Sequence, residues 1–294
     1  MPRIRTVELS VVRVVISTVL LYALLAAVRL GAKLVGYRHV GFFCDDASIR
    51  HEFRSETVTL FVLLGGCYIT AFVVIILVEV YRVCCSTSSE SVQYEWRGNN
   101  VHPLIVRLVK YFGYFQAGYV FMIVIGTVTK RAVGRLRPNF FDVCKPSQYS
   151  CTGNSYITDY VCEGEDEKKI ANSRSSFYSG HSVLAIYTAV YLMLYLRSQV
   201  SSVTKCRVIV AIVEMLLLSL ALYVCYTRLH DNMHHATDVL VGIVVGVAGA
   251  AYTAILWAGM FREKQHEQCC DSTLDIENVI QPYPIVKSPR QELM

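Results

Sequence analysis

The sequence predicts an all-α membrane protein in which six transmembrane helices form a helical bundle, with a reactive site at one membrane face. Three observations support this fold class. Of the 294 residues, 54% are hydrophobic and only 17% are charged, which is more apolar than a soluble domain of this size. The chain contains six long apolar runs, and one span needs about 20 predominantly apolar residues. Ionisable side chains gather between these runs, because unpaired charges are costly within hydrocarbon.

The six apolar runs are expected to cross the membrane in chain order. They cover residues 11–34, 57–80, 111–129, 182–196, 208–226 and 238–261. Together they form one membrane domain, residues 1–262, and the polar, proline-containing stretch 263–294 is expected to be a disordered tail. In the last run, Gly242 and Gly246 have the spacing of a close helix contact, either within the bundle, which we prefer, or in a dimer.

Loops separated by an even number of crossings face the same side of the membrane. Residues 35–56, 130–181 and 227–237 therefore share one face, and both termini share the other. Lys and Arg occur on both faces, so the positive-inside rule does not decide by count alone. If the cations of the three loops bind an anionic substrate, their number no longer indicates which face is cytosolic. Both termini are then expected in the cytosol and the site on the extracellular or lumenal face, in the plasma membrane or an internal membrane.

The cysteines agree with this topology. Four of them lie in loops of the expected outer face: Cys44, Cys144, Cys151 and Cys162. An even number suits one or two disulfides in an oxidising compartment, although the sequence does not give the pairing. On the cytosolic side, the pairs Cys84–Cys85 and Cys269–Cys270 are either palmitoylation sites or ordinary reduced thiols.

The formal net charge of +5 raises the question of a nucleic-acid partner. The Lys and Arg residues are scattered along the loops, and no basic helix face or aromatic–basic recognition motif occurs. The sequence therefore argues against nucleic acid and for a lipid bilayer as the surroundings. A homo-oligomer is compatible with the sequence.

The first polar cluster, Lys130–Pro138, follows the third apolar run. Its four cations are Lys130, Arg131, Arg135 and Arg137. They are enough to hold a group with two negative charges, because Arg offers a planar fork of donors and Lys a point charge for phosphate oxygens. Taken alone, the cluster fits equally well an interfacial anchor whose side chains reach lipid headgroups.

The second cluster, Ser176–Ser182, precedes the fourth apolar run. Ser179 and Gly180 would open a helix, whose free backbone N–H groups form an anion site at the positive end of the helix dipole. His181 would exchange a proton beside that site. An ordinary solvated helix cap explains the same residues.

The third cluster, Tyr226–Asp238, lies between the last two runs and contains Arg228, another donor for an oxyanion. His234 and Asp238 are four residues apart, so a helix that begins here would place them on one face. The aspartate would then orient the imidazole as a nucleophile or base. His235 competes with His234, and the spacing alone does not choose between them.

A metal centre is the rival interpretation of these clusters. The six candidate ligands are His181, His230, Asp231, His234, His235 and Asp238, which is enough for a two-histidine, one-carboxylate centre. Against it stands the excess of Lys and Arg on the same face, which would repel a divalent cation. We therefore expect no metal and no cofactor.

Taken together, the spacings of Lys130 to Pro138, Ser179 to His181 and Arg228 to Asp238 resemble the three signature motifs of the type 2 phosphatidic acid phosphatase superfamily. Gly41–Ile49, Gly134–Cys144 and Ser176–Ser182 resemble the animal lipid phosphate phosphatases in particular. The resemblance covers about residues 10 to 262. It departs at Thr227, where the third motif of the family usually has Ser, and threonine keeps the hydroxyl.

The resemblance implies a role for each motif residue. His234, oriented by Asp238, would attack phosphorus and form a phosphohistidine, and His181 would act as general acid and then base. The phosphate oxygens would be held by the remaining motif residues, namely Lys130, Arg137, Ser179, the Gly180 amide and Arg228. Arg131, Arg135 and His235 are secondary candidates, and His230 and Asp231 are expected to be surface loop residues.

The function implied is hydrolysis of lipid phosphates without magnesium. The substrates would be phosphatidate, lysophosphatidate, sphingosine 1-phosphate and ceramide 1-phosphate. The alternatives are a phosphotransferase that uses the same phosphohistidine, and a catalytically silent scaffold that binds lipid phosphates. A transporter fits less well, because the ionisable clusters lie at one membrane face and not at the midplane.

Overall fold

A computed structural model describes residues 5–8, 10–85, 92–200 and 207–261. In this part of the chain six helices are long and apolar enough to cross a membrane, which confirms the predicted fold class. They are α1 (Val11–Val35), α2 (Leu60–Cys85), α3 (Pro103–Val133), α6 (Gly180–Val200), α7 (Arg207–His230) and α8 (Ala236–Ala251). The expected tail 263–294 and the pair Cys269–Cys270 lie outside the described residues.

The ends of the spans differ from the predicted bounds, most of all at α3. Helix α3 is longer than the apolar run 111–129, because Pro103 stands at its first position and the His102 imidazole accepts a hydrogen bond from the Leu104 N–H at 3.2 Å. The sixth span is α8 up to Ala251, and it continues as a π-helical turn, η3 (Tyr252–Trp257).

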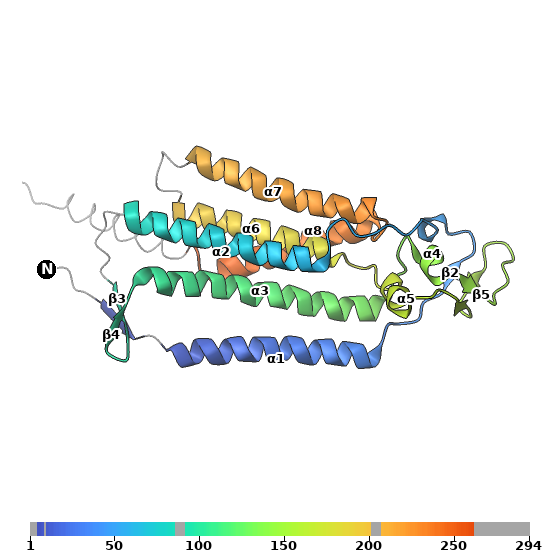
Figure 1. The fold of residues 1–294 in the computed structure, drawn as a ribbon, viewed down its shortest axis with the longest axis horizontal. Coiled ribbons are helices and arrows are strands. Elements are labelled where there is room, and N and C mark those ends of the chain that lie inside the picture. The colour runs from blue at the N-terminus through green and yellow to red at the C-terminus, as the bar shows by residue number, and fades with distance from the viewer. Residues whose placement is uncertain (1–4, 9, 86–91, 201–206, 262–294) are drawn as a thin grey trace, which may run out of the picture.

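Helix α6 is the centre of the bundle and packs against α2, α3, α7 and α8 (Figure 1). Gly242 and Gly246 of α8 permit the closest of these contacts. A Cβ atom at Gly242 would lie 2.9 Å from the Ser179 carbonyl oxygen, and one at Gly246 would lie 2.8 Å from that of Val183. The preferred interpretation of the glycine spacing, packing within the bundle, is therefore confirmed. Helix α1 packs along α3 and buries none of its residues.

The loops at one end of the bundle form a small second core, seen on the right of Figure 1. It contains the short helices α4 (Phe140–Cys144) and α5 (Glu167–Ser173) and the 3-10 turn η1 (Ala47–Ile49). Two short antiparallel pairs complete it: β2 (Phe42–Phe43) with β6 (Tyr156–Ile157), and β5 (Pro146–Ser147) with β7 (Val161–Cys162). Its buried side chains include Phe42, Ile49, Leu136, Phe140 and Tyr160.

Two disulfides fasten these loops to one another. Cys44 pairs with Cys151, and Cys144 pairs with Cys162. The four cysteines that the sequence placed on one face are therefore all paired. The first disulfide joins the loop after α1 to the long segment between α3 and α6, which connects the first polar cluster to the second.

The other end of the bundle carries a small sheet that the sequence analysis did not predict. Strand β3 (Val92–Trp96) pairs in parallel with β1 (Arg5–Glu8) and antiparallel with β4 (Asn99–Val101). The strands are short, and β1 lies far from its partner in the sequence. Local alternation of polar and apolar residues was therefore too brief to reveal them.

Candidate active site

The three polar clusters of the sequence meet at the loop-bearing end of the bundle. They line one cavity of about 360 Å³. Five predicted site residues are in its wall: Lys130, Arg137, Gly180, His181 and His234. The loop that precedes α2 adds Glu56, and the short helix α5 adds Asn172.

The end of α3 sets the positions of the first cluster. Gly134 ends the helix with φ 67°, and a Cβ there would lie 2.7 Å from the Arg38 carbonyl oxygen, so glycine is required at this turn. The turn leaves Lys130 on the last turn of α3 and leads the chain on to Arg135 and Arg137.

Arg137 is almost fully buried beside the cavity. Its Nη2 donates to Asn172 Oδ1 at 2.8 Å and its Nη1 to the sulfur of Met233 at 3.2 Å, whereas Nε has no hydrogen-bond partner among the described residues. Burial lowers the pKa of Arg137 to about 10, although the Glu56 carboxylate acts in the opposite direction. Arg137 therefore remains charged at neutral pH and keeps one open donor.

The second cluster forms the first turn of α6. Gly180 lines the cavity, and a Cβ at this position would lie 4.0 Å from Cε of Lys130. His181 follows it, and Nε2 of its ring has no hydrogen-bond partner in the described part of the chain. Ser179 differs from the prediction, because it is fully buried and its hydroxyl accepts a hydrogen bond from Ser182 Oγ at 2.9 Å. Its side chain is not in the cavity wall.

The third cluster lies where α7 leads into α8. His234 is buried in the cavity wall, and its Nδ1 has no hydrogen-bond partner among the residues described. Burial, followed by the nearby cations Arg137 and Lys130, holds the pKa of His234 well below its usual value. The imidazole is therefore neutral at physiological pH, the form in which it can act as a nucleophile.

The relation of His234 to Asp238 is looser than the sequence predicted. Helix α8 begins at Ala236 with His235 as its N-cap, so His234 precedes the helix and the four-residue spacing does not stack it on Asp238. His234 Nδ1 lies 3.9 Å from Asp238 Oδ2, beyond hydrogen-bond range, while His235 Nδ1 lies at 3.3 Å. Only His234 of the two lines the cavity.

Asp238 is held by several donors from the first two clusters. Arg135 Nη1 donates to Oδ1 at 2.5 Å, and the Ser176 hydroxyl donates to Oδ2 at 2.5 Å. The secondary candidate Arg135 is therefore the ion-pair partner of the aspartate. Arg131 lies instead over the ring of Tyr37, at 3.6 Å, and is not in the cavity wall.

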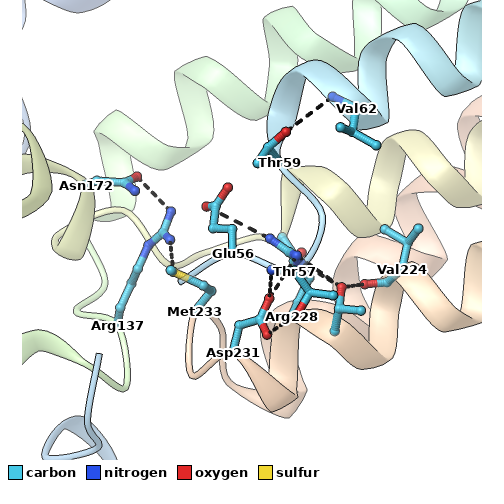
Figure 2. A network of polar contacts seen from close by, with 12 residues as sticks. Glu56, Thr57, Thr59, Val62, Arg137, Asn172, Val224, Arg228, Asp231 and Met233 are labelled. Atoms are coloured by element: carbon cyan, nitrogen blue, oxygen red, sulfur yellow. Dashed lines mark hydrogen bonds and ion pairs between the residues drawn. The ribbon is translucent and has the colours of Figure 1, made fainter. Parts of the chain in front are cut away.

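Arg228 is fully buried and does not line the cavity, and Figure 2 shows its side chain beside those of Thr57 and Asp231. Its Nε and Nη2 donate to the Thr227 hydroxyl at 3.2 and 3.0 Å, and Nη2 also donates to Asp231 Oδ2 at 3.1 Å. Nη1 has no hydrogen-bond partner among the described residues and lies 3.9 Å from Glu56 Oε1. The hydroxyl of Thr227 thus accepts hydrogen bonds that position Arg228. A serine hydroxyl at this place could accept the same bonds.

Asp231 is not the surface residue that the sequence analysis expected. It is 1% exposed, and it accepts hydrogen bonds from the Thr57 amide at 2.8 Å and the Thr57 hydroxyl at 2.7 Å. Burial alone would raise the pKa of Asp231, but the bonds from Thr57, together with His230 and Arg228, outweigh it and lower the pKa. The neighbouring His230 is exposed, as expected.

Sequence reasoning missed Glu56, Thr57 and Asn172. Glu56 is the last residue of the loop 35–56, which the span count had placed on the reactive face, and Thr57 is the first residue of the predicted run 57–80, although α2 begins only at Leu60. Their position was therefore a usable signal. In the described ranges no three His, Cys, Asp or Glu side chains are arranged to hold a metal ion, so the two-histidine, one-carboxylate centre is not assembled there.

Comparison with known proteins identifies this arrangement of motifs. The sequence model of the PAP2 superfamily matches residues 111–262, which include all three polar clusters. The chain belongs to the PAP2 superfamily. Within it the chain falls among the animal lipid phosphate phosphatases, and it is an integral, multi-pass membrane protein.

Several curated relatives resemble this PAP2 chain along most of their length. The Phospholipid phosphatase homolog 1.2 homolog of Caenorhabditis elegans is 41% identical over 80% of this chain and 70% of the relative. Phospholipid phosphatase 2 of Mus musculus is 33% identical over 78% of this chain and 80% of the relative. Phospholipid phosphatase 1 of the same species is 30% identical over 76% of each. No solved structure matches the chain.

Proposed function

We propose that this PAP2 protein hydrolyses the phosphomonoester of lipid phosphates through a phosphohistidine, without magnesium. The observation that carries the proposal is that His181 and His234 line one cavity with Lys130 and Arg137, and each histidine has a ring nitrogen without a hydrogen-bond partner in the described residues. Two histidines among cations fit a nucleophile and a general acid acting on one phosphate. The names of the relatives, phospholipid phosphatases, support a phosphatase that acts on a phospholipid.

The phosphate oxygens would be held by Lys130, Arg137, the Gly180 amide and Arg228. Two donors are open for them among the described residues, Arg137 Nε and Arg228 Nη1. Donors fixed in advance stabilise the charge that spreads over the equatorial oxygens in the transition state. The Ser179 hydroxyl accepts from Ser182 and keeps its own proton to donate, but it is outside the cavity wall, so it would take part only if its side chain turned toward the cavity.

In the first step Nε2 of neutral His234 attacks phosphorus, because Nδ1 is the nitrogen that faces Asp238. The bond from phosphorus to the ester oxygen breaks, its electron pair stays on that oxygen, and the oxygen takes a proton from protonated His181. The products are the phosphohistidine and the lipid alcohol. Asp238 would orient His234 by closing the present 3.9 Å separation when the substrate binds, since catalytic hydrogen bonds are often long in empty sites.

In the second step neutral His181 takes a proton from water as the water oxygen bonds to phosphorus. The phosphorus–nitrogen bond breaks, and its electron pair returns to His234. Inorganic phosphate leaves, and His181 is protonated again for the next cycle. Lys130, Arg137 and Arg228, which together form a cationic cradle for the phosphate, would supply the positive charge that a metal ion gives in other phosphatases. This is the basis for proposing magnesium independence.

The rest of the cavity suits a lipid alcohol as the leaving group. Beyond Lys130 the wall continues along α3 to Ile123 and Met122, about two helical turns away, and α2 adds Leu60 and Leu64. The site therefore combines a charged end with an apolar wall inside the bundle. Phosphatidate, lysophosphatidate, sphingosine 1-phosphate and ceramide 1-phosphate all have this polarity.

The disulfides support an extracellular or lumenal position for the site, with both termini in the cytosol. Both bonds, Cys44–Cys151 and Cys144–Cys162, lie in the loops that surround the site. Disulfides form and persist in oxidising compartments and are rare in the cytosol.

The test is release of inorganic phosphate from phosphatidate by the detergent-purified protein in excess EDTA. His234→Ala is compared with the matched variant His235→Ala, whose side chain is outside the cavity wall. Release that persists in EDTA, disappears in His234→Ala and survives in His235→Ala supports the proposal. Loss in EDTA would indicate a metal-dependent reaction. Release only with an added lipid alcohol would indicate a phosphotransferase, and binding without release would indicate a silent scaffold.

A further inference from the structure

Glu56 is the one acidic side chain among the described residues that line the cavity. Figure 2 shows it between the side chains of Arg137 and Arg228. Its carboxylate acts electrostatically on both arginines and on Lys130. A negative charge thus stands among the cations that would hold a phosphate dianion.

Glu56 is not needed to hold the side chains of Arg137 and Arg228 in place. Arg228 is fixed by Thr227 and Asp231, and Arg137 by Asn172. The closest approach of Glu56 is 3.9 Å, from Oε1 to Arg228 Nη1, which is too long for a hydrogen bond. Its carboxylate therefore keeps most of its accepting capacity for a ligand.

The backbone at Glu56 is anchored although its carboxylate is not. The next residue, Thr57, donates its amide and its hydroxyl to buried Asp231. The side chain of Glu56 is 28% exposed, so it lies at the mouth of the cavity and is partly shielded from water. An anchored, partly desolvated carboxylate interacts more strongly with a ligand charge than one on the surface.

A carboxylate in this position repels a bound phosphate dianion. The repulsion becomes an attraction when the substrate has its own cation close to the phosphate ester. With the phosphate in the cradle of Lys130, Arg137 and Arg228, an ammonium group on the neighbouring carbon would lie at the cavity mouth, where a carboxylate can accept a charge-assisted hydrogen bond.

We propose that Glu56 determines specificity, favouring lipid phosphates with an ammonium group on the carbon next to the phosphate ester over lipid phosphates without one. This inference rests on the proposed phosphatase function. Sphingosine 1-phosphate has such an ammonium group. Ceramide 1-phosphate has a closely related skeleton with the nitrogen acylated, so the two form a matched pair of substrates.

The experiment measures kcat/KM for sphingosine 1-phosphate and ceramide 1-phosphate with the purified full chain and with Glu56→Gln. The ratio of the two values should fall about tenfold in Glu56→Gln, the effect of losing one charge-assisted hydrogen bond. The value for ceramide 1-phosphate should stay equal or rise, because the repulsion is removed. The control is Glu52→Gln, which makes the same charge change in the same exposed loop outside the cavity wall and should leave the ratio unchanged.

Glu56→Ala is a second neutral variant that should lower the ratio in the same way if Glu56→Gln does not fold. Removing the carboxylate should also tighten inhibition by inorganic phosphate severalfold in either variant. A ratio that stays at the wild-type value in a folded, active variant would overturn the assignment. So would an equal loss for both substrates, which would make Glu56 a general part of the site. If the wild type released phosphate from neither substrate, the proposed function itself would fail.

Discussion

Both ends of the helical bundle bury charged side chains, but the partners of these side chains differ between the two ends. At the end away from the cavity, Glu79 is fully buried, accepts a hydrogen bond from the Tyr195 hydroxyl at 2.7 Å and forms ion pairs with Arg82 and Arg107. Near it, Glu214 pairs with Arg197. Each buried carboxylate there has a cationic partner within the chain.

At the cavity end, cations and histidines keep open atoms. The open atoms of the candidate site, which have no hydrogen-bond partner in the described residues, are Arg137 Nε, Arg228 Nη1, His181 Nε2 and His234 Nδ1. Glu79 Oε2 at the far end also lacks a hydrogen bond, but it lies 3.7 Å from Arg107 Nη1. Leaving a buried polar group unpaired costs about 1–3 kcal/mol, so a fold gains nothing in stability from such a cluster. The comparison teaches that the buried carboxylates at the far end are neutralised by arginines of the same chain, whereas the cavity end gathers several open donors and ring nitrogens in one place, as a site prepared for an anionic ligand does.

The largest effect is expected at the nucleophile. His234→Ala should lower phosphate release by at least about 10⁴-fold, because loss of a covalent nucleophile leaves only binding and charge stabilisation. His235→Ala should lose far less, since its imidazole is outside the cavity wall. Steady-state phosphate release from phosphatidate measures both. Equal losses in the two variants would contradict the choice of His234.

The next largest effect is expected at the open donor of Arg228. Arg228→Lys keeps the charge but loses the planar fork, of which Nε and Nη2 are already bound to Thr227 and Asp231. We expect kcat to fall about 100-fold, as for removal of one oxyanion donor. Single-turnover kinetics separate this loss from slower product release. A variant with unchanged kcat would show that Arg228 is a structural cation, like those at the opposite end.

A smaller effect is expected at the buried support of Arg228. Asp231→Asn removes the charge that holds the guanidinium while keeping the shape, and kcat/KM should fall about tenfold. Its one carbonyl oxygen can still accept from the Thr57 amide, while the Thr57 hydroxyl has to turn and accept from the new NH2 group. Asp231 is a positioning residue, so its effect should disappear when Arg228 is already replaced. A double-mutant cycle with Arg228→Lys tests this, and strictly additive losses would contradict it.

Protonation of His234 should appear in the stability of the protein. The pKa of His234 is held below its unfolded value by burial and by Arg137 and Lys130. Below about pH 6.5 His234 binds a proton in the unfolded chain but stays neutral in the folded chain. The free energy of unfolding therefore falls as the pH falls. The thermal midpoint of the wild type should therefore drop more between about pH 7.5 and about pH 5.5 than that of His234→Gln. An equal drop would indicate that His234 titrates normally in the fold.

The smallest effect on catalysis is expected at the far end. Glu79→Gln should destabilise the protein by about 1–3 kcal/mol, because two arginines lose a buried partner, and should leave kcat/KM for phosphatidate unchanged. Thermal unfolding in detergent measures the first and phosphate release the second. A strong loss of activity in the folded variant would contradict the assignment of stability to the far end and of catalysis to the cavity end.

The sequence alone predicted those features that depend on local pattern. Six apolar runs gave the six spans, the spacing of Gly242 and Gly246 gave a helix contact, and the span count placed Cys44 and Cys151 on one face. The motif spacing brought Lys130, Arg137, His181 and His234 into one candidate site, and the structure places these four around one cavity.

Contacts between distant segments could not be read in this way. Thr57 and Asp231 are 174 residues apart in the chain, so no spacing rule connects them. The stacking of His234 on Asp238 was inferred from helical periodicity, which does not apply because the helix begins at Ala236. Ser179 was expected to bind phosphate, but its side chain is fully buried outside the cavity wall, a packing result that the motif spacing does not contain.

The most direct test of the central claim is to trap the phosphoenzyme. If His234 carries the phosphate and His181 activates the water that removes it, then His181→Ala should accumulate a covalent phosphate when given a substrate with a good leaving group. The label should be labile in acid and stable in base, as expected for phosphohistidine, and it should be absent from the double variant His181→Ala, His234→Ala. A label that survives the loss of His234, or one that is stable in acid, would contradict the account.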